Sequence, residues 1–149
     1  MDTLNSPKLP PVLVVDPDTA HTRLLRRSLA RARMVNPVVG FARADRALSY
    51  LHGTGRYADR SLYRMPAVIV TSFGIDDPDG RRILEAVRSS IPLRKTPVVA
   101  IGTTSAEEEV HEAHRLGATA YLARPLACRA IVQVITSLNM PWSVSETGS

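Results

Sequence analysis

The chain of 149 residues is long enough for one domain with a substantial core, and its 44% hydrophobic and 22% charged fractions are ordinary for a globular protein. Lys and Arg number 19 against 14 Asp and Glu, and the resulting net charge of +5 suits acidic partners or nucleic acid without indicating a fold. No apolar run approaches the roughly 20 residues of a membrane span, and the single cysteine, Cys128, excludes an internal disulfide and a CxxC metal cluster.

Both ends of the chain are polar and read as loose segments. Residues 1–10 are predicted to form a flexible N-terminal arm, which shows no secretory signal pattern, and residues 139–149 a C-terminal tail. The folded domain is expected to span residues 11–138. Without a membrane segment or a signal, we expect a cytoplasmic protein.

The first predicted element is a strand over Val12–Val15, whose continuous apolar run indicates burial on both faces of a sheet. A helix follows, and Asp18 or Thr19 can cap its start. The spacing of apolar residues predicts that this helix faces the core through Leu24, Leu25, Leu29 and Ala32.

The same alternation continues along the chain. Further strands are predicted at residues 36–41, 67–70, 97–101 and 119–123, and further helices at residues 44–52, 81–89, 105–116 and 126–138. Ser105 and Glu108 have the spacing of a capping box. Residues 54–65 are turn-like and basic, and residues 73–80 form a loop rich in Asp, Pro and Gly.

Five strands that alternate with five helices predict an α/β fold, a doubly wound five-stranded parallel sheet covered on both faces. In such sheets the functional groups gather at the carboxyl ends of the strands. The residues at those ends are Asp16, Pro17, Asp18, Ser72, Gly102, Thr103 and Arg124.

Four segments, in this order and spacing, resemble the CheY-like receiver domains of two-component response regulators: VLVVDPDTAHTRLL, PAVIVTSFGIDDPDG, TPVVAIGTTSAEEEV and LGATAYLARP. The resemblance spans about residues 11–138. The segment HGTGRYADRSLYRMP and the tail are similar to single-domain regulators that partner phytochrome-type kinases. The resemblance implies a flavodoxin-like, CheY-like fold and a role in phosphorelay signalling.

In such receivers, two acidic residues after the first strand and an aspartate ending the third bind Mg²⁺, and that aspartate takes a phosphoryl group from a kinase. A hydroxyl residue ending the fourth strand and a lysine ending the fifth then contact the phosphoryl oxygens. The resemblance places Ser72 at the acceptor position, Gly102 at the hydroxyl position beside Thr103, and Arg124 at the lysine position. The pocket therefore looks degenerate.

The acidic pair is also changed: the resemblance places Asp18 at the second acidic position and Pro17 at the first, with Asp16 one place earlier. Tyr121 matches the aromatic residue that changes rotamer on activation in receivers, and Pro125 matches a proline that is cis in the family. Both are candidate switch or interface residues.

A serine hydroxyl is a weak nucleophile unless a base activates it, and all four histidines (His21, His52, His111 and His114) fall on helical patterns, away from the strand ends. We therefore expect no enzymatic activity, no cofactor and no metal, with Asp18 holding weak Mg²⁺ at most. Arg124 is expected to reach Asp18 and fill the pocket; alternatively, it is solvated at the rim.

The resulting hypothesis is a pseudo-receiver that acts by protein–protein interaction. Its expected partners are a sensor histidine kinase or another receiver or output protein; as an alternative within signalling, it would act as a competitor that occupies a kinase without accepting phosphate. A homodimer through the last strand and last two helices (Ser105–Leu138) is a further expectation. Two alternatives remain: phosphorylation at a relocated aspartate among residues 76–79, expected to lie outside the strand-end cluster, and a basic nucleic-acid-associated protein, which the lack of a recognition motif disfavours.

Overall fold

The computed structural model describes residues 9–103, 106–124 and 127–138, and of residues 127–129 it describes the backbone alone. Within these ranges five strands alternate with five α-helices, as predicted. The predicted arm (residues 1–8 of it), the tail, Ser105 and Pro125 lie outside the described residues. The strands are β1 (Val12–Val15), β2 (Val38–Phe41), β3 (Val68–Ser72), β4 (Val98–Gly102) and β5 (Ala120–Ala123). The helices are α2 (Thr19–Arg31), α3 (Ala44–His52), η1 (a 3₁₀ turn, Gly55–Tyr57), α4 (Pro78–Ser89), α5 (Glu107–Arg115) and α6 (Ala127–Ser137).

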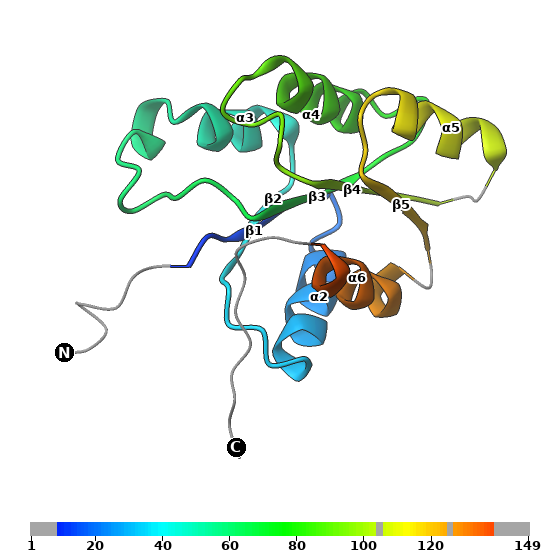
Figure 1. Ribbon diagram of the computed structural model, residues 1–149, viewed down its shortest axis with the longest axis horizontal. Coiled ribbons are helices and arrows are strands. Elements are labelled where there is room, and N and C mark those ends of the chain that lie inside the picture. The colour runs from blue at the N-terminus through cyan, green and yellow to red at the C-terminus, as the bar shows by residue number, and fades with distance from the viewer. Residues whose placement is uncertain (1–8, 104–105, 125–126, 139–149) are drawn as a thin grey trace.

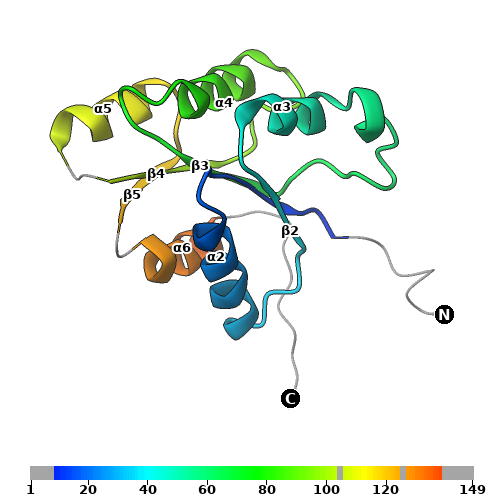
Figure 2. The same cartoon turned by 180° about the vertical axis from the view of Figure 1, so that it is seen from behind.

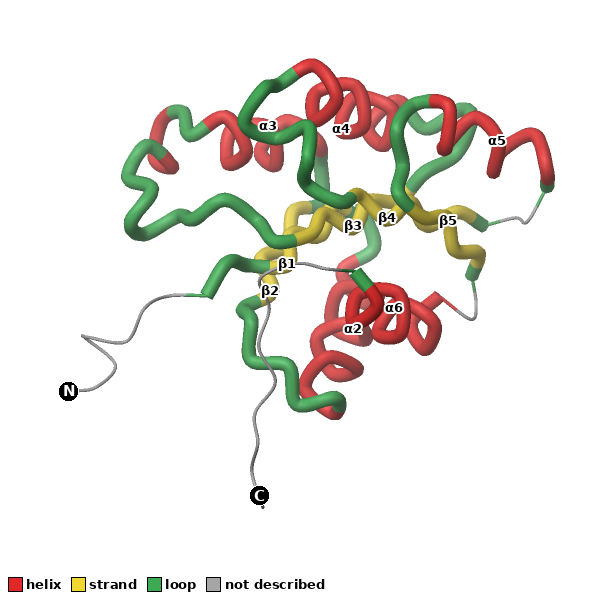
Figure 3. Tube along the Cα trace, viewed as in Figure 1, coloured by secondary structure: helices red, strands yellow, loops and turns green. Residues whose placement is uncertain are grey.

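All strand pairs are parallel, in the spatial order β2-β1-β3-β4-β5. Helices α3, α4 and α5 cover one face of the sheet, and α2 and α6 cover the other (Figures 1 and 2). Figure 3 shows the strands as one central layer between these helices. The structure thus confirms the doubly wound fold. None of the helices in the described ranges is long and apolar enough to cross a membrane.

The core has two halves because successive residues of a strand point to opposite faces. Leu13 and Ile69 pack under α3, α4 and α5, whereas their neighbours Val14 and Val70 pack under α2 and α6. Each strand is therefore apolar on both sides, which explains the continuous apolar runs in the sequence.

Two predicted details are wrong. Helix α4 begins at Pro78, not at residue 81, because the Asp77 side chain caps it and the fixed φ of proline suits its first turn. Leu24 does not face the core: it is 45% exposed, and Thr22, Leu25 and Leu29 form the buried stripe of α2. Their spacing of three and four residues matches the 3.6-residue helical period.

Candidate functional site

A hollow of about 620 Å³ lies at the carboxyl ends of β1, β3, β4 and β5, where the sequence predicted the site. Six of the seven predicted pocket residues line it: Asp16, Pro17, Asp18, Ser72, Thr103 and Arg124. The exception is Gly102, which is buried at the end of β4. Residues that the sequence did not predict also line the hollow, namely His21, Phe73, Gly74, Ile75, Asp76, Asp77, Ile101 and Glu109.

Asp16 is one of two buried acids that line this hollow, at 6% exposure; Glu109, at 8%, is the other. Oδ1 of Asp16 accepts a hydrogen bond from the backbone N–H of Asp18 at 2.8 Å, and its Oδ2 lies 2.5 Å from Nη2 of Arg124. The Arg124 side chain is 19% exposed, so it is not solvated at the rim. Burial and short distance make this a charge-assisted contact of the stronger kind.

The expectation that Arg124 reaches Asp18 is therefore wrong. The Asp18 side chain turns toward α2 and caps it, with Oδ1 2.9 Å from the N–H of Ala20, and remains 55% exposed. Because of the conformation of the turn around Pro17, the carboxylate that faces Arg124 is that of Asp16.

His21 lies in the first turn of α2 and bridges the two acids. Its Nδ1 is 3.1 Å from Oδ2 of Asp16, and its Nε2 is 3.5 Å from Oδ2 of Asp18. The expectation that no histidine lies near a strand end is wrong, because the helix that follows β1 begins at the carboxyl edge of the sheet. Both ring nitrogens face carboxylates, so the ring is placed to hold the acids rather than to deprotonate Ser72.

The Ser72 hydroxyl donates a hydrogen bond to Oδ2 of Asp77 at 3.2 Å. Oδ1 of the same carboxylate caps α4, where it accepts from the N–H groups of Asp79 (3.0 Å) and Gly80 (3.3 Å). This aspartate thus joins the end of β3 to the start of α4. Because Asp77 caps α4 and contacts Ser72, the loop between β3 and α4 lies over the end of β3.

The loop aspartates divide into two groups. Asp76 and Asp77 line the hollow, so their expected place outside the strand-end cluster is wrong. Asp79 does lie apart, because its Oδ2 accepts a hydrogen bond from the N–H of Ala44 at the start of α3. Asp77 thus lines the hollow and also caps α4.

At the end of β4, the side chain of Tyr121 takes the space beside Gly102. The Tyr121 hydroxyl donates a 2.5 Å hydrogen bond to Oε2 of Glu109, which is 8% exposed on α5. Oε1 of Glu109 accepts from the N–H of Ile75 at 3.3 Å. A Cβ at position 102 would overlap the Tyr121 hydroxyl and lie 2.7 Å from Oε2 of Glu109. Glycine at this position is therefore required by the inward tyrosine.

Burial, and then the hydrogen bond to Glu109, raise the pKa of Tyr121 above its ordinary value. The hydroxyl consequently stays protonated and keeps donating to the carboxylate throughout the physiological pH range. This partly buried hydrogen bond links β5 to α5.

Several acidic side chains of the hollow already contact protein groups in place of a metal ion. Mg²⁺ prefers several free oxygens in octahedral geometry. Both oxygens of Asp16 already accept hydrogen bonds, Oδ1 of Asp18 caps a helix, and position 72 supplies a hydroxyl. A divalent cation at Asp16 would have to displace the guanidinium of Arg124. No group of three or more His, Cys, Asp or Glu side chains able to hold a metal occurs in the described part of the chain.

The sequence held signals for two of the missed residues. Glu109 lies four and seven residues before Ala113 and Leu116, which are both buried, so its carboxylate falls on the apolar face of α5. A charge there needs a polar partner, and Tyr121 is that partner. His21 lies in the first turn after a strand, which always reaches the carboxyl edge of such a sheet.

No family model matches the chain. The chain is similar to a solved bacteriophytochrome response regulator, RtBRR, at 30% identity over 95% of this chain and 84% of that one, with a TM-score of 0.77. The structure of the response regulator RPA3017 in red light signaling of R. palustris is 26% identical over 89% and 99% of the two chains, with a TM-score of 0.76. The response regulator Rcp1 of Synechocystis sp. is 22% identical over 98% of this chain and 96% of that protein.

Proposed function

This chain belongs to the receiver family of response regulators, and we propose that it is a pseudo-receiver, which signals by binding other proteins and accepts no phosphoryl group. One observation carries the proposal. The residue at the end of β3 is Ser72, whose hydroxyl is bonded to Asp77, while Arg124 and Asp16 form an ion pair in the same hollow.

Phosphoryl transfer from a phosphohistidine would need a nucleophile at the end of β3. A serine hydroxyl attacks only when a base removes its proton. Oδ1 of the neighbouring Asp77 caps α4, and its Oδ2, which accepts from the Ser72 hydroxyl, belongs to a carboxylate, a far weaker base than a serine alkoxide; both ring nitrogens of His21 face carboxylates. We propose that neither Mg²⁺ nor another cofactor takes part, because the guanidinium of Arg124 supplies the positive charge beside Asp16.

The signalling surface is then held in one state. In receivers the aromatic residue of β5 moves between two positions, but here the Tyr121 hydroxyl is bonded to Glu109 in the space that Gly102 leaves open. We propose that this chain is fixed in the inward form of Tyr121, so that partner binding does not depend on a phosphoryl signal.

The partner class follows from the relatives. RtBRR is a bacteriophytochrome response regulator by name, and we propose that this chain likewise engages a phytochrome-type sensor histidine kinase or a second receiver of that pathway. The face formed by α5, β5 and α6 is our candidate for contact with a second receiver, including a second copy of the chain.

The test is a mixture of the protein with a radiolabelled, phosphorylated phytochrome-type kinase. We expect a complex in light scattering after gel filtration, with the label retained on the kinase. Ser72→Asp with Arg124→Lys is the matched control, since it restores an acceptor and the lysine found in active receivers. Transfer of the label to the wild-type chain would overturn the proposal.

A second candidate is a receiver that is phosphorylated at Asp77. The observation in its favour is that the Asp77 carboxylate lines the same hollow and contacts Ser72. In the same assay, label on the wild type that Asp77→Asn abolishes would establish this alternative, and label that persists in this variant would exclude it.

A further inference from the structure

A second hollow, of about 680 Å³, lies at the opposite end of the sheet from Ser72. The end of α4, the loop from α4 to β4, the start of β4, the end of α5 and the start of β5 enclose it. It shares no lining residue with the hollow around Ser72. A ligand here would leave the degenerate pocket accessible.

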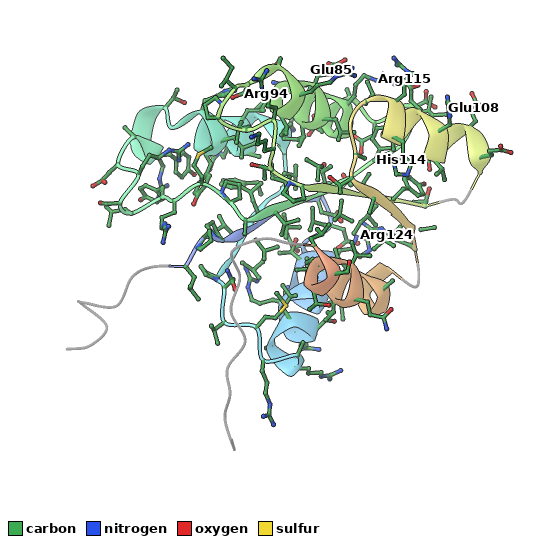
Figure 4. The ribbon with its side chains drawn as sticks, viewed as in Figure 1. Glu85, Arg94, Glu108, His114, Arg115 and Arg124 are labelled. Carbon is green, nitrogen blue, oxygen red and sulfur yellow. The ribbon has the colours of Figure 1, made fainter. Side chains whose placement is uncertain are left out.

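The walls of this hollow, which we call the basic hollow, carry one sign of charge. Its cationic lining residues are Arg88, Arg94, Lys95 and Arg115, joined by His114. None of the described residues that line it carries a carboxylate. Figure 4 shows Arg94, His114 and Arg115 on the α4 and α5 side of the sheet, with Arg124 on the other side.

Neighbouring groups hold part of this cluster in place. Arg88 donates from Nη1 to the carbonyl oxygen of Arg115 at 3.0 Å. Glu112, outside the hollow, binds Arg115 through both carboxylate oxygens at 2.8 Å, and Arg81 at 2.9 Å. The Nδ1 atom of His114 lies 3.1 Å from the carbonyl oxygen of Ala118, to which it is placed to donate.

The floor of the basic hollow is apolar. Leu84, Val87 and Val98 are all buried and line it. The hydroxyl oxygen of Thr119 accepts from the N–H of Val98 at 3.1 Å, which leaves its proton to donate. The hollow therefore combines a cationic wall with an apolar base and a volume within the range of ligand sites, about 300–1,000 Å³.

Glu112 balances the charge of Arg115, but the remaining lining cations repel one another, and a bound anion relieves that repulsion. The guanidinium fork and the lysine ammonium both suit phosphate oxygens. Arg88, Arg94 and Lys95 match a ligand with two or more phosphate groups, and the apolar floor fits a sugar or base ring beside them. We propose that the basic hollow binds a free nucleotide that carries a diphosphate or triphosphate group.

The experiment is isothermal titration calorimetry of the full chain, in about 150 mM salt to suppress diffuse charge effects. The probes are ATP, inorganic pyrophosphate and adenosine. The test variant joins Arg94→Glu with Lys95→Glu, both on exposed side chains. The control joins Arg23→Glu with Arg27→Glu on α2, where the same change in charge falls on exposed side chains of the opposite face. Circular dichroism checks that both variants fold.

We expect ATP and pyrophosphate to bind at one site per chain and adenosine not to bind. The test variant should weaken ATP binding by at least about tenfold, because it converts two attractive contacts into repulsive ones, whereas the control should stay within about twofold. Equal weakening in both variants, or no ATP binding at about millimolar concentration, would overturn the proposal. So would displacement of ATP by duplex DNA at lower molar concentration, which would assign the surface to nucleic acid instead.

Discussion

Replacing Gly102 by alanine should expel Tyr121 from its inward position. The new Cβ would overlap the tyrosine hydroxyl and lie 2.7 Å from Oε2 of Glu109. The tyrosine must then move, and Glu109, at 8% exposure, loses a donor at 2.5 Å; among the described residues it keeps the N–H of Ile75 at 3.3 Å.

The cost has two parts. A hydrogen bond to a charged group contributes about 1.5–3 kcal/mol to stability, and inserting a methyl group into a filled space costs about 1–3 kcal/mol. Because movement of the tyrosine relieves part of the overlap, we expect a net loss of about 3 kcal/mol. For a domain of this length that corresponds to a fall in Tm of roughly 6–12 °C.

A double-mutant cycle measured by thermal or urea unfolding isolates this contact. In a Tyr121→Ala background, Gly102→Ala should cost less than about 1 kcal/mol, because the remaining neighbour, the Glu109 carboxylate, ends a flexible side chain. The reasoning is refuted if Gly102→Ala leaves the unfolding midpoint unchanged, or if it costs the same in both backgrounds.

Three further predictions concern the ion pairs and Tyr121. Arg124→Met should lower stability by about 2–3 kcal/mol in urea unfolding, because the buried Asp16 carboxyl loses its cationic partner, and Arg124→Lys should lose less. An unchanged midpoint for Arg124→Met would contradict the contact. The Arg115 and Arg81 side chains lower the pKa of Glu112 from 4.5 to about 2, so the stability that its ion pairs contribute is present above pH 4.5 and is lost as pH falls toward 2. In Glu112→Gln the free energy of unfolding should therefore fall less steeply between pH 4.5 and pH 2. The same pH dependence in wild type and variant would count against the pairing. Because the pKa of Tyr121 is raised above 10.0, Tyr121→Phe should barely change the tyrosinate absorbance near pH 10, and a clear fall would show that the hydroxyl is not held as described.

The helices and strands could be predicted from local sequence patterns. β1 and α3 have the predicted bounds, because a continuous apolar run marks a buried strand, and Gly53 closes α3 with a positive φ of 66°. The sequence also predicted that Ser72 and Arg124 lie at the same edge of the sheet, since the carboxyl ends of parallel strands share that edge.

The pairing of side chains across that edge did not follow from the sequence. Whether Asp16 or Asp18 faces Arg124 depends on the backbone of the turn around Pro17, which strand and helix patterns do not specify. Likewise, the link between Gly102 and Tyr121 joins two strands, and its necessity appears only when a Cβ is placed at position 102. Such contacts are set by tertiary geometry rather than by local periodicity.

The central claim, that the chain accepts no phosphoryl group, is tested most directly by intact-mass spectrometry after incubation with acetyl phosphate and Mg²⁺, beside a Ser72→Asp variant. We expect the wild type to keep its unmodified mass under conditions in which an active receiver is modified. A gain of one phosphoryl group by the wild type would contradict the claim, and peptide mapping would then show whether Ser72 or Asp77 carries it.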